Sequence, residues 1–160
     1  MEYDSLMRES IGRFKYKNRR EYADFYVQEL LDTCGAAVCA WNVDLLIPIP
    51  LHKSRRRKRG FNQAELIAKK LGKELKIPVS TDSLLRIRKT SPQKELNDQE
   101  RKSNLKNAFQ VVNNDVKLKK VLLIDDIYTT GSTIDAAASV LLEHGAEKVY
   151  FLSISIGRGY

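Results

Sequence analysis

Continuous apolar runs alternate along the chain with segments whose apolar residues recur every three or four positions. Leu45–Ile49 and Val121–Ile124 are apolar at successive positions, a pattern typical of strands that helices cover on both faces. Segments 62–75 and 134–141 carry apolar residues at the spacing of one helical face. We also expect a helix around Tyr22–Leu30 and strands at Val43–Ile49, Ile77–Ser80, Leu84–Arg88, Ala108–Val112 and Val149–Ile156.

The order of these elements predicts the fold class. Strands that alternate with helices favour a parallel sheet joined by right-handed crossovers. We therefore expect an α/β fold, a Rossmann-like, doubly wound and mostly parallel sheet flanked by helices, in a single domain over residues 1–160. The pair His144-Gly145 is predicted to end the last helix, which assigns His144 a structural role.

The first candidate site follows the strand Val121–Ile124 and contains Asp125, Asp126 and the turn Thr129-Thr130-Gly131-Ser132-Thr133. Open α/β sheets bind ligands at the carboxyl ends of their strands. The turn offers backbone N–H groups and hydroxyls at the start of a helix, where a monophosphate fits. Adjacent half-buried carboxylates need hydroxyl donors or a cation, and a ribose with magnesium supplies both. Alternatively, the acids belong to an ordinary loop and the threonines cap the helix.

The second candidate site follows the strand Val43–Ile49, because six of the seven residues from Lys53 to Arg59 are basic. Three interpretations compete: a solvated surface segment, a nucleic-acid contact, and a loop that neutralises a pyrophosphate at the same sheet edge as the two acids. We favour the pyrophosphate loop, which does not exclude nucleic-acid binding. Its expected residues are Leu51, His52, Lys53, Arg55, Arg56, Arg57 and Arg59.

Together, the acid pair and the threonine-rich turn resemble the phosphoribosyl pyrophosphate (PRPP) binding motif of type I phosphoribosyltransferases. The resemblance implies that Asp125 and Asp126 bind the ribose hydroxyls and that Thr129–Thr133 bind the 5′-phosphate, with Mg²⁺ as cofactor. It implies no dedicated set of metal ligands, and the two acids would reach the metal through water. Hypoxanthine-guanine enzymes place an acid at the position of Thr129, so the hydroxyl here disfavours purine-salvage chemistry.

The polar stretch 89–106 holds too few apolar residues to join a core, and we expect it to be a mobile flap over the site. Closure of a flap would exclude water from the reacting ribose. The candidates to contact the pyrophosphate from this region are Arg88, Lys89, Gln93 and Arg101. The alternative is a surface loop with a short helix that begins near Asn97, and a lid can contain such a helix.

Further segments narrow the resemblance to one family. Ile47–His52, the basic run, Arg59-Gly60-Phe61-Asn62-Gln63, Thr90–Gln93, Arg101–Asn104 and the Asp125 motif resemble the ComF-type family in order and spacing. This family is similar to amidophosphoribosyltransferases and is associated with natural competence, the uptake of single-stranded DNA. Its members often carry an N-terminal four-cysteine zinc module. The sequence has two cysteines, so we expect this module to be absent, in a natural short form or by truncation.

The composition is that of a globular domain. The chain has 42% hydrophobic and 30% charged residues and a net charge of +8, and no stretch approaches the roughly 20 apolar residues of a membrane span. The start, Met1-Glu2-Tyr3-Asp4, lacks the features of a signal peptide, so we expect a cytoplasmic protein. Cys34 and Cys39 are expected to be buried, reduced thiols.

We therefore predict a magnesium-dependent phosphoribosyltransferase that transfers the phosphoribosyl group of PRPP to a nitrogen nucleophile. Two alternatives stay open: a competence-associated factor for single-stranded DNA uptake, in which the basic run binds DNA, and a non-catalytic regulator that senses PRPP. A homodimer or a competence-protein partner is compatible with the pattern.

Overall fold

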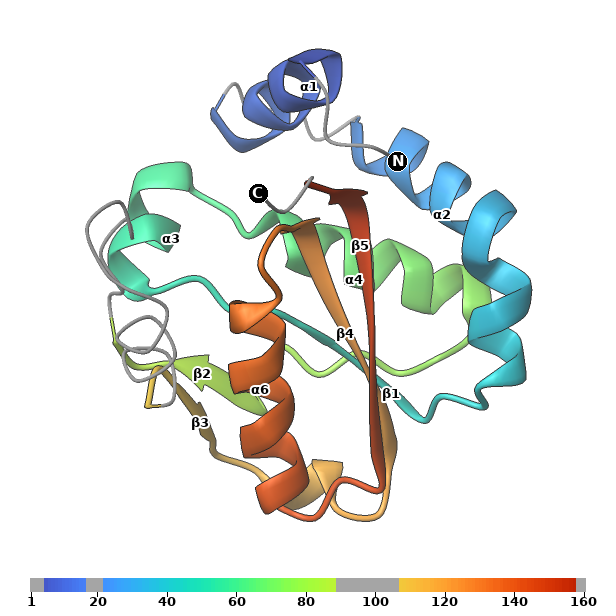
Figure 1. The fold of residues 1–160 in the computed structure, drawn as a ribbon, viewed down its shortest axis with the longest axis vertical. Coiled ribbons are helices and arrows are strands. Elements are labelled where there is room, and N and C mark those ends of the chain that lie inside the picture. The colour runs from blue at the N-terminus through green and yellow to red at the C-terminus, as the bar shows by residue number, and fades with distance from the viewer. Residues whose placement is uncertain (1–4, 17–21, 89–106, 158–160) are drawn as a thin grey trace.

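The computed structural model describes residues 5–16, 22–88 and 107–157, and Figure 1 shows its elements. The helices are α1 (Ser5–Tyr16), α2 (Tyr22–Ala40), α3 (Lys53–Arg59), α4 (Gln63–Leu75) and α6 (Ser132–Glu143), with a 3₁₀ turn η1 (Asn114–Val116). The strands are β1 (Leu45–Pro48), β2 (Leu84–Arg86), β3 (Phe109–Val111), β4 (Lys120–Tyr128) and β5 (Lys148–Ile156). The predicted flap 89–106 lies outside the described residues.

A parallel sheet with the strand order β1-β4-β5 forms the centre of the fold. Val121 of β4 pairs with Leu45 of β1 on one side and with Val149 of β5 on the other. The predicted parallel α/β arrangement is confirmed. The segment Ile77–Ser80 contributes less than predicted, because only Val79 forms a parallel bridge to β1. The preceding Pro78 has no N–H with which to extend the ladder.

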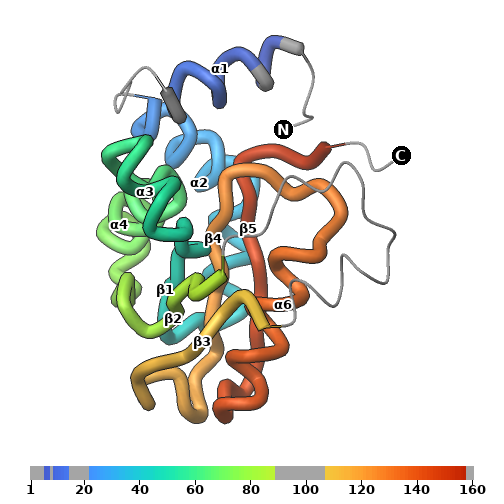
Figure 2. Tube along the Cα trace, turned by 90° about the vertical axis from the view of Figure 1, so that its left-hand side faces the viewer, coloured from blue at the N-terminus to red at the C-terminus, as the bar shows by residue number. Residues whose placement is uncertain are grey.

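Helices cover both faces of this sheet, as Figure 2 shows with α2 and α4 on one side and α6 on the other. Alternate residues of a strand point to opposite faces. Leu46 and Leu122 pack with α1, α2 and α4 in a first core, whereas Leu45 and Leu123 pack with α6 in a second core. The two-sided burial that the continuous apolar runs predicted is confirmed, and the sheet separates two hydrophobic cores.

β2 and β3 form a small sheet of their own. They pair antiparallel, with Arg86 opposite Phe109, and stand outside the main sheet. Leu84 and Phe109 join the second core, which fixes the small sheet against β1 and α6. The fully buried Ser83 donates from its hydroxyl to the carboxylate of Asp115 in η1. Both strands were predicted from the sequence, but not their departure from the parallel sheet.

The N-terminal part forms two helices, of which the sequence analysis anticipated only the second. α1 buries Ile11 and Phe14, and the Phe14 ring centre lies 5.6 Å from that of Tyr26 and 5.9 Å from that of Phe61. Met7, Ile11 and Phe14 recur at helical spacing, so the signal for α1 was present in the sequence. Through these contacts α1 lies beyond the carboxyl ends of β4 and β5 (Figure 1).

The basic run forms a helix, α3, so the prediction that it is a loop is wrong. The His52 side chain precedes this seven-residue helix and accepts the N–H of Ser54 at its Nδ1 over 3.3 Å. Gly60 ends the helix with a φ of 80°, in the left-handed region that glycine favours. Arg56 pairs with Glu65 of α4 over 3.1 Å, which offsets part of the repulsion among the cations. Two caps and one carboxylate thus support a helix of like charges.

Smaller predictions have mixed outcomes. His144 is the C-cap of α6 and Gly145 follows with a φ of 89°, so the predicted helix end is confirmed. Cys34 and Cys39 are free thiols, half-buried and exposed respectively, and the predicted burial was wrong for Cys39. Among the described residues, no helix has both the length and the apolar character needed to span a membrane.

Candidate functional site

Asp125 and Asp126 lie inside β4, which runs on to Tyr128, and not beyond the strand end as predicted. The ladder continues because β5 pairs with β4 along this whole stretch. Strand alternation places Asp125 on the face of Leu123 and the second core, and Asp126 on the face of the first core. Both carboxylates are half-buried, and the Asp126 N–H donates to Asp125 Oδ1 over 2.8 Å. The strand therefore separates two charges that are adjacent in sequence.

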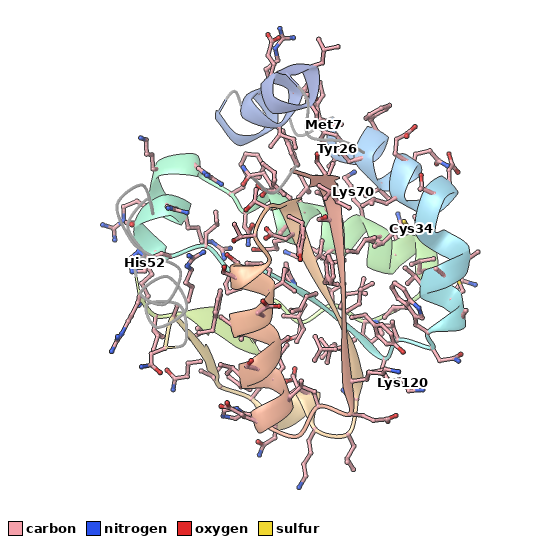
Figure 3. The ribbon with its side chains drawn as sticks, viewed as in Figure 1. Met7, Tyr26, Cys34, His52, Lys70 and Lys120 are labelled. Carbon is pink, nitrogen blue, oxygen red and sulfur yellow. The ribbon has the colours of Figure 1, made fainter. Side chains whose placement is uncertain are left out.

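Tyr26 of α2 lies on the side of Asp126. Its side chain is fully buried beneath α1, where Figure 3 labels it, and its hydroxyl is 2.6 Å from Ser10 Oγ. Burial raises the pKa of Tyr26, and the negative charge of Asp126 adds to that rise. The hydroxyl group of Tyr26 thus lies on the same side of the sheet as Asp126 and within electrostatic range of it.

Arg86 of the small sheet lies on the side of Asp125. Its guanidinium carbon is 5.5 Å from the centre of the Phe109 ring, and its side chain is half-buried. Burial lowers the pKa of Arg86, the like charge of Arg55 lowers it further, and the charge of Asp125 acts in the opposite direction. Side chains from α3, β2 and β4 therefore meet within electrostatic range of one another.

A small pocket joins Asp125 to the threonine-rich turn. Its lining consists of Asp125, Ile127, Tyr128, Thr129, Thr130, Gly131, Ser132, Thr133 and Ile134. Gly131 has a φ of 77°, and α6 begins directly after it. The first N–H groups of an α-helix have no acceptor within the helix, so those of α6 are available where the turn lines the pocket. The Thr130 and Ser132 hydroxyl oxygens are 3.0 Å apart.

The predicted pyrophosphate residues, in and just before α3, differ in exposure. The half-buried members are Leu51, His52, Arg55 and Arg59, and the exposed members are Lys53, Arg56 and Arg57. Arg55 lies within electrostatic range of Arg86, whereas Arg56 pairs with Glu65 on α4 and Arg57 faces solvent. The helix therefore brings only part of the predicted set to the sheet edge and leaves another part outside.

Asn62 ties the segment that contains α3 to the core. Its Nδ2 donates to the Ile49 carbonyl over 3.0 Å, and its Oδ1 accepts the Ala64 N–H over 3.1 Å at the start of α4. The Ile49 N–H donates in turn to the Ile124 carbonyl of β4 over 2.8 Å. With 6% of its surface exposed, Asn62 holds both ends of the stretch between β1 and α4.

Arg86 and Tyr26 are the site neighbours that the sequence analysis missed. Among the predicted flap contacts, Arg88 is exposed, and Lys89, Gln93 and Arg101 lie outside the described residues. Leu84 is buried, so strand alternation predicts an inward Arg86. No comparable signal marks Tyr26, because a helical apolar face assigns it to the core and nothing in the sequence places Asp126 beside it.

A comparison with known families agrees with this geometry. Residues 57–154 match the family described as the phosphoribosyl transferase domain. The chain belongs to the phosphoribosyl transferase family. The matched range of this phosphoribosyl transferase domain contains Arg86, Asp125, Asp126 and the turn that precedes α6.

Relatives of the phosphoribosyl transferase domain place it in the ComF group. Competence protein F of Haemophilus influenzae is 37% identical over 108 residues, which cover 66% of this chain and 47% of that protein. Competence protein ComFC of Bacillus subtilis is 34% identical over 143 residues, which cover 89% of this chain and 56% of that protein. The predicted ComF-type membership is confirmed. The chain spans about half the length of these relatives.

A solved structure of the same fold supports the architecture. The purine phosphoribosyltransferase of Pyrococcus horikoshii Ot3 matches with a TM-score of 0.52 at 15% identity, over 82% of this chain and 74% of that one. At this identity the likeness concerns the fold alone. The predicted type I phosphoribosyltransferase fold is confirmed.

Proposed function

We propose that this ComF-type domain binds PRPP and transfers its phosphoribosyl group to a nitrogen nucleophile. The pocket that joins Asp125 to the Thr129–Thr133 turn is the main support, because it sets a carboxylate beside N–H groups at a helix start. In this arrangement the 5′-phosphate lies at the turn and the ribose lies over β4. The diphosphate then extends toward Arg55 of α3.

The reaction needs little covalent chemistry from the protein. The bond between ribose C1 and the pyrophosphate oxygen breaks, and pyrophosphate leaves with the electron pair. The nucleophile's nitrogen forms a bond to C1 and releases its proton to water. Catalysis is then mainly positioning of the ribose by Asp125 and Asp126 and neutralisation of the leaving group by cations such as Arg55.

The donor set at β4 fits a magnesium ion. Mg²⁺ is usually bound by one or two carboxylates together with substrate phosphates and several waters, and Asp125 and Asp126 are half-buried carboxylates beside the proposed ribose site. When bound, the ion would supply charge neutralisation to the diphosphate. The two carboxylates would hold the ribose hydroxyls and reach the ion through water.

Calorimetry with PRPP and Mg²⁺ tests this proposal. Asp125→Asn combined with Asp126→Asn should abolish PRPP binding while the circular dichroism spectrum stays that of wild type. Asp32→Asn removes an exposed carboxylate on α2 and serves as the matched control. If the double variant binds PRPP as tightly as wild type, the proposed site is wrong.

A second assay identifies the acceptor. Pyrophosphate release from PRPP and Mg²⁺ is measured against a panel of ammonia, glutamine, purines, pyrimidines and orotate. Release with one acceptor only would name the nucleophile and establish turnover. Tight PRPP binding without release against any member would favour the PRPP-sensing regulator over the enzyme.

Contact with single-stranded DNA is a second candidate function, and the exposed side of α3 supports it. Lys53, Arg57 and Lys58 are exposed on this helix, and Arg56 pairs with Glu65 of α4. Clustered cations attract nucleic-acid phosphates and release counterions on binding. The names of the two relatives, both competence proteins, agree with such a role.

The DNA function predicts a steep loss of single-stranded DNA affinity as salt rises. Replacing Lys53, Arg57 and Lys58 by Gln should weaken this affinity and flatten its salt dependence. A control with the same loss of charge replaces Lys73, Lys76 and Lys117, which are also exposed. If the two triple variants change the DNA affinity and its salt dependence equally, the attraction is non-specific and α3 is not the DNA-binding surface.

A further inference from the structure

A cavity lies between α3 and α4, two helices that Figure 2 shows side by side. It measures about 140 Å³ and is lined by Arg56 of α3, by Glu65, Leu66 and Lys69 of α4, and by the connection Gly60–Asn62. None of these residues lines the pocket beside Asp125. α4 packs in the first core, whereas that pocket reaches Ile134 of the second core. The cavity is therefore separate from the proposed PRPP site.

The apolar part of the cavity wall is held in place by the core. Phe61 and Leu66 form this part, and both pack against the first core. The Phe61 ring centre lies 5.9 Å from that of Phe14, which is fully buried on α1. A cavity of roughly 150 Å³ can hold a benzene ring. The cavity between α3 and α4 thus has room for one six-membered ring beside an aromatic side chain.

Two cations that share one carboxylate form the charged part of the lining. Glu65 pairs with Arg56 over 3.1 Å and with Lys69 over 2.7 Å. The Glu65 side chain is 14% exposed, whereas those of Arg56 and Lys69 are 56% and 58% exposed. An arginine has five N–H donors and a lysine has three, so one carboxylate uses only part of their capacity. This part of the lining carries a net positive charge and offers donors to an anion.

Room for one ring beside two exposed cations matches a nucleotide, which has a planar base and an anionic phosphate. Three more cations are exposed on the same helix as Arg56: Lys53, Arg57 and Lys58. A free mononucleotide needs one phosphate contact, whereas several cations suit the successive phosphates of a strand. We propose that the cavity binds one base of single-stranded DNA against Phe61, while Arg56 and Lys69 contact the adjoining phosphate.

This inference deepens the second candidate function, contact with single-stranded DNA, and rests on it. Clustered cations attract the phosphates of single and double strands alike. A base of duplex DNA enters a cavity only at the cost of unstacking and unpairing, whereas a base of a single strand is free to do so. α3 would thus supply attraction to phosphates, and the cavity would supply selection for unpaired bases.

Fluorescence anisotropy tests the base site with three probes: oligothymidylate, an abasic strand of the same length, and a duplex of the same length. Thymine has the single ring for which the cavity has room. Phe61→Leu keeps an apolar side chain but loses the ring. Phe25→Leu removes a ring that is 58% exposed on α2 and is the matched control. We expect Phe61→Leu to weaken oligothymidylate at least about 5-fold and to leave the other two probes within about 2-fold, and Phe25→Leu to change none.

The abasic strand separates the base site from the contact at α3. If wild type binds oligothymidylate no more tightly than the abasic strand, the base site is wrong and the α3 contact stands. Equal weakening of both strands by Phe61→Leu would come from a loss of structure and would also overturn the base site. A wild type that binds neither strand would overturn the second candidate function and this inference together.

The phosphate contact has a test of its own. Lys69→Gln should weaken oligothymidylate and the abasic strand by a similar factor and lower the salt slope of each by about one. Lys73→Gln removes an exposed cation of α4 that does not line the cavity, and it is the matched control. Equal effects of the two substitutions would show that Lys69 makes no phosphate contact of its own and would contradict the assignment.

A measurement on wild type removes any dependence on the folding of variants. Strands that carry 5-iodouracil form photochemical crosslinks to aromatic side chains beside the base, and mass spectrometry identifies the crosslinked residue. A single strand should crosslink to Phe61, and a duplex with the same label should not. Crosslinks at the exposed Phe25 with none at Phe61 would contradict the inference.

Discussion

The Asn62 side chain donates from Nδ2 to the main-chain carbonyl of Ile49 over 3.0 Å. This bond joins the residue after β1 to the residue before α4, so it closes the stretch that contains α3. Asn62 also caps α4 through the Ala64 N–H. The position of Arg55 relative to β4 therefore depends on one buried amide.

Substitution of Asn62 should separate helix capping from positioning of α3. Asn62→Ala loses both bonds and should destabilise the protein by about 1–3 kcal/mol, as expected for a buried cap that leaves a carbonyl unsatisfied. Asn62→Ser keeps a capping hydroxyl but has no amide donor for Ile49, so it should regain part of the stability and little of the PRPP affinity. Urea unfolding and calorimetry measure the two effects. Full PRPP affinity in Asn62→Ser would refute the positioning role.

Gly131→Ala should damage the pocket beside Asp125. A left-handed φ of 77° costs an alanine about 1–2 kcal/mol, and its Cβ would lie 2.7 Å from Tyr128 Oη. We expect a lower free energy of unfolding and weaker ribose 5-phosphate binding. Gly35→Ala on α2, where the nearest atom to a Cβ is 3.9 Å away, is the matched control and should be neutral or stabilising. Equal effects of both substitutions would contradict the explanation.

Tyr26 should make stability fall at high pH. Its pKa is raised in the folded protein by burial and by Asp126. The contribution of Tyr26 to the free energy of unfolding is fully present below the ordinary tyrosine pKa of about 10. It is lost as pH rises toward the folded pKa, because the tyrosine of the unfolded chain releases its proton first. Urea unfolding of wild type and Tyr26→Phe at pH 8 and pH 11 measures this. The free energy of unfolding of wild type relative to that of Tyr26→Phe should be lower at pH 11 than at pH 8. The same difference at both pH values would contradict the prediction.

Ser83→Ala should loosen the small sheet. The Ser83 hydroxyl is fully buried and donates to the Asp115 carboxylate, whose other oxygen is buried without a hydrogen-bond partner among the described residues. Loss of this donor should lower the free energy of unfolding by about 1–3 kcal/mol. Thermal unfolding checks it, with the exposed Ser139→Ala as the control expected within about 0.5 kcal/mol of wild type. Similar midpoints for the two variants would show that the contact is unimportant.

The elements that position the acid pair were predictable because local pattern and long-range packing agree there. Val121–Ile124 is apolar at every position and is buried on both faces, and Gly131 marks the turn that starts α6. α3 was not predictable in the same way. A run of cations disfavours a helix by itself, and the residues that support it, His52, Gly60 and Glu65, act through caps and a neighbouring helix.

Arg86 shows a second limit of sequence analysis. It belongs to a three-residue strand, and its surroundings come from Arg55 and Asp125, which are about 30 and 40 positions away in the chain. Only the packing of the small sheet on the second core brings these charges together. A pattern along the chain reports which face a side chain occupies, but not which distant charges it meets there.

The opposite orientation of Asp125 and Asp126 on β4 has a consequence for unfolding. Each carboxylate lies on the sheet face of a different core, so a ribose held by both would connect two packing units that the sheet otherwise keeps apart. Ligand binding stabilises only states in which both units are folded. A bound ligand would then make the two packing units unfold together. The opening free energies that hydrogen exchange measures in α2 and in α6 should therefore become more similar when the site is filled.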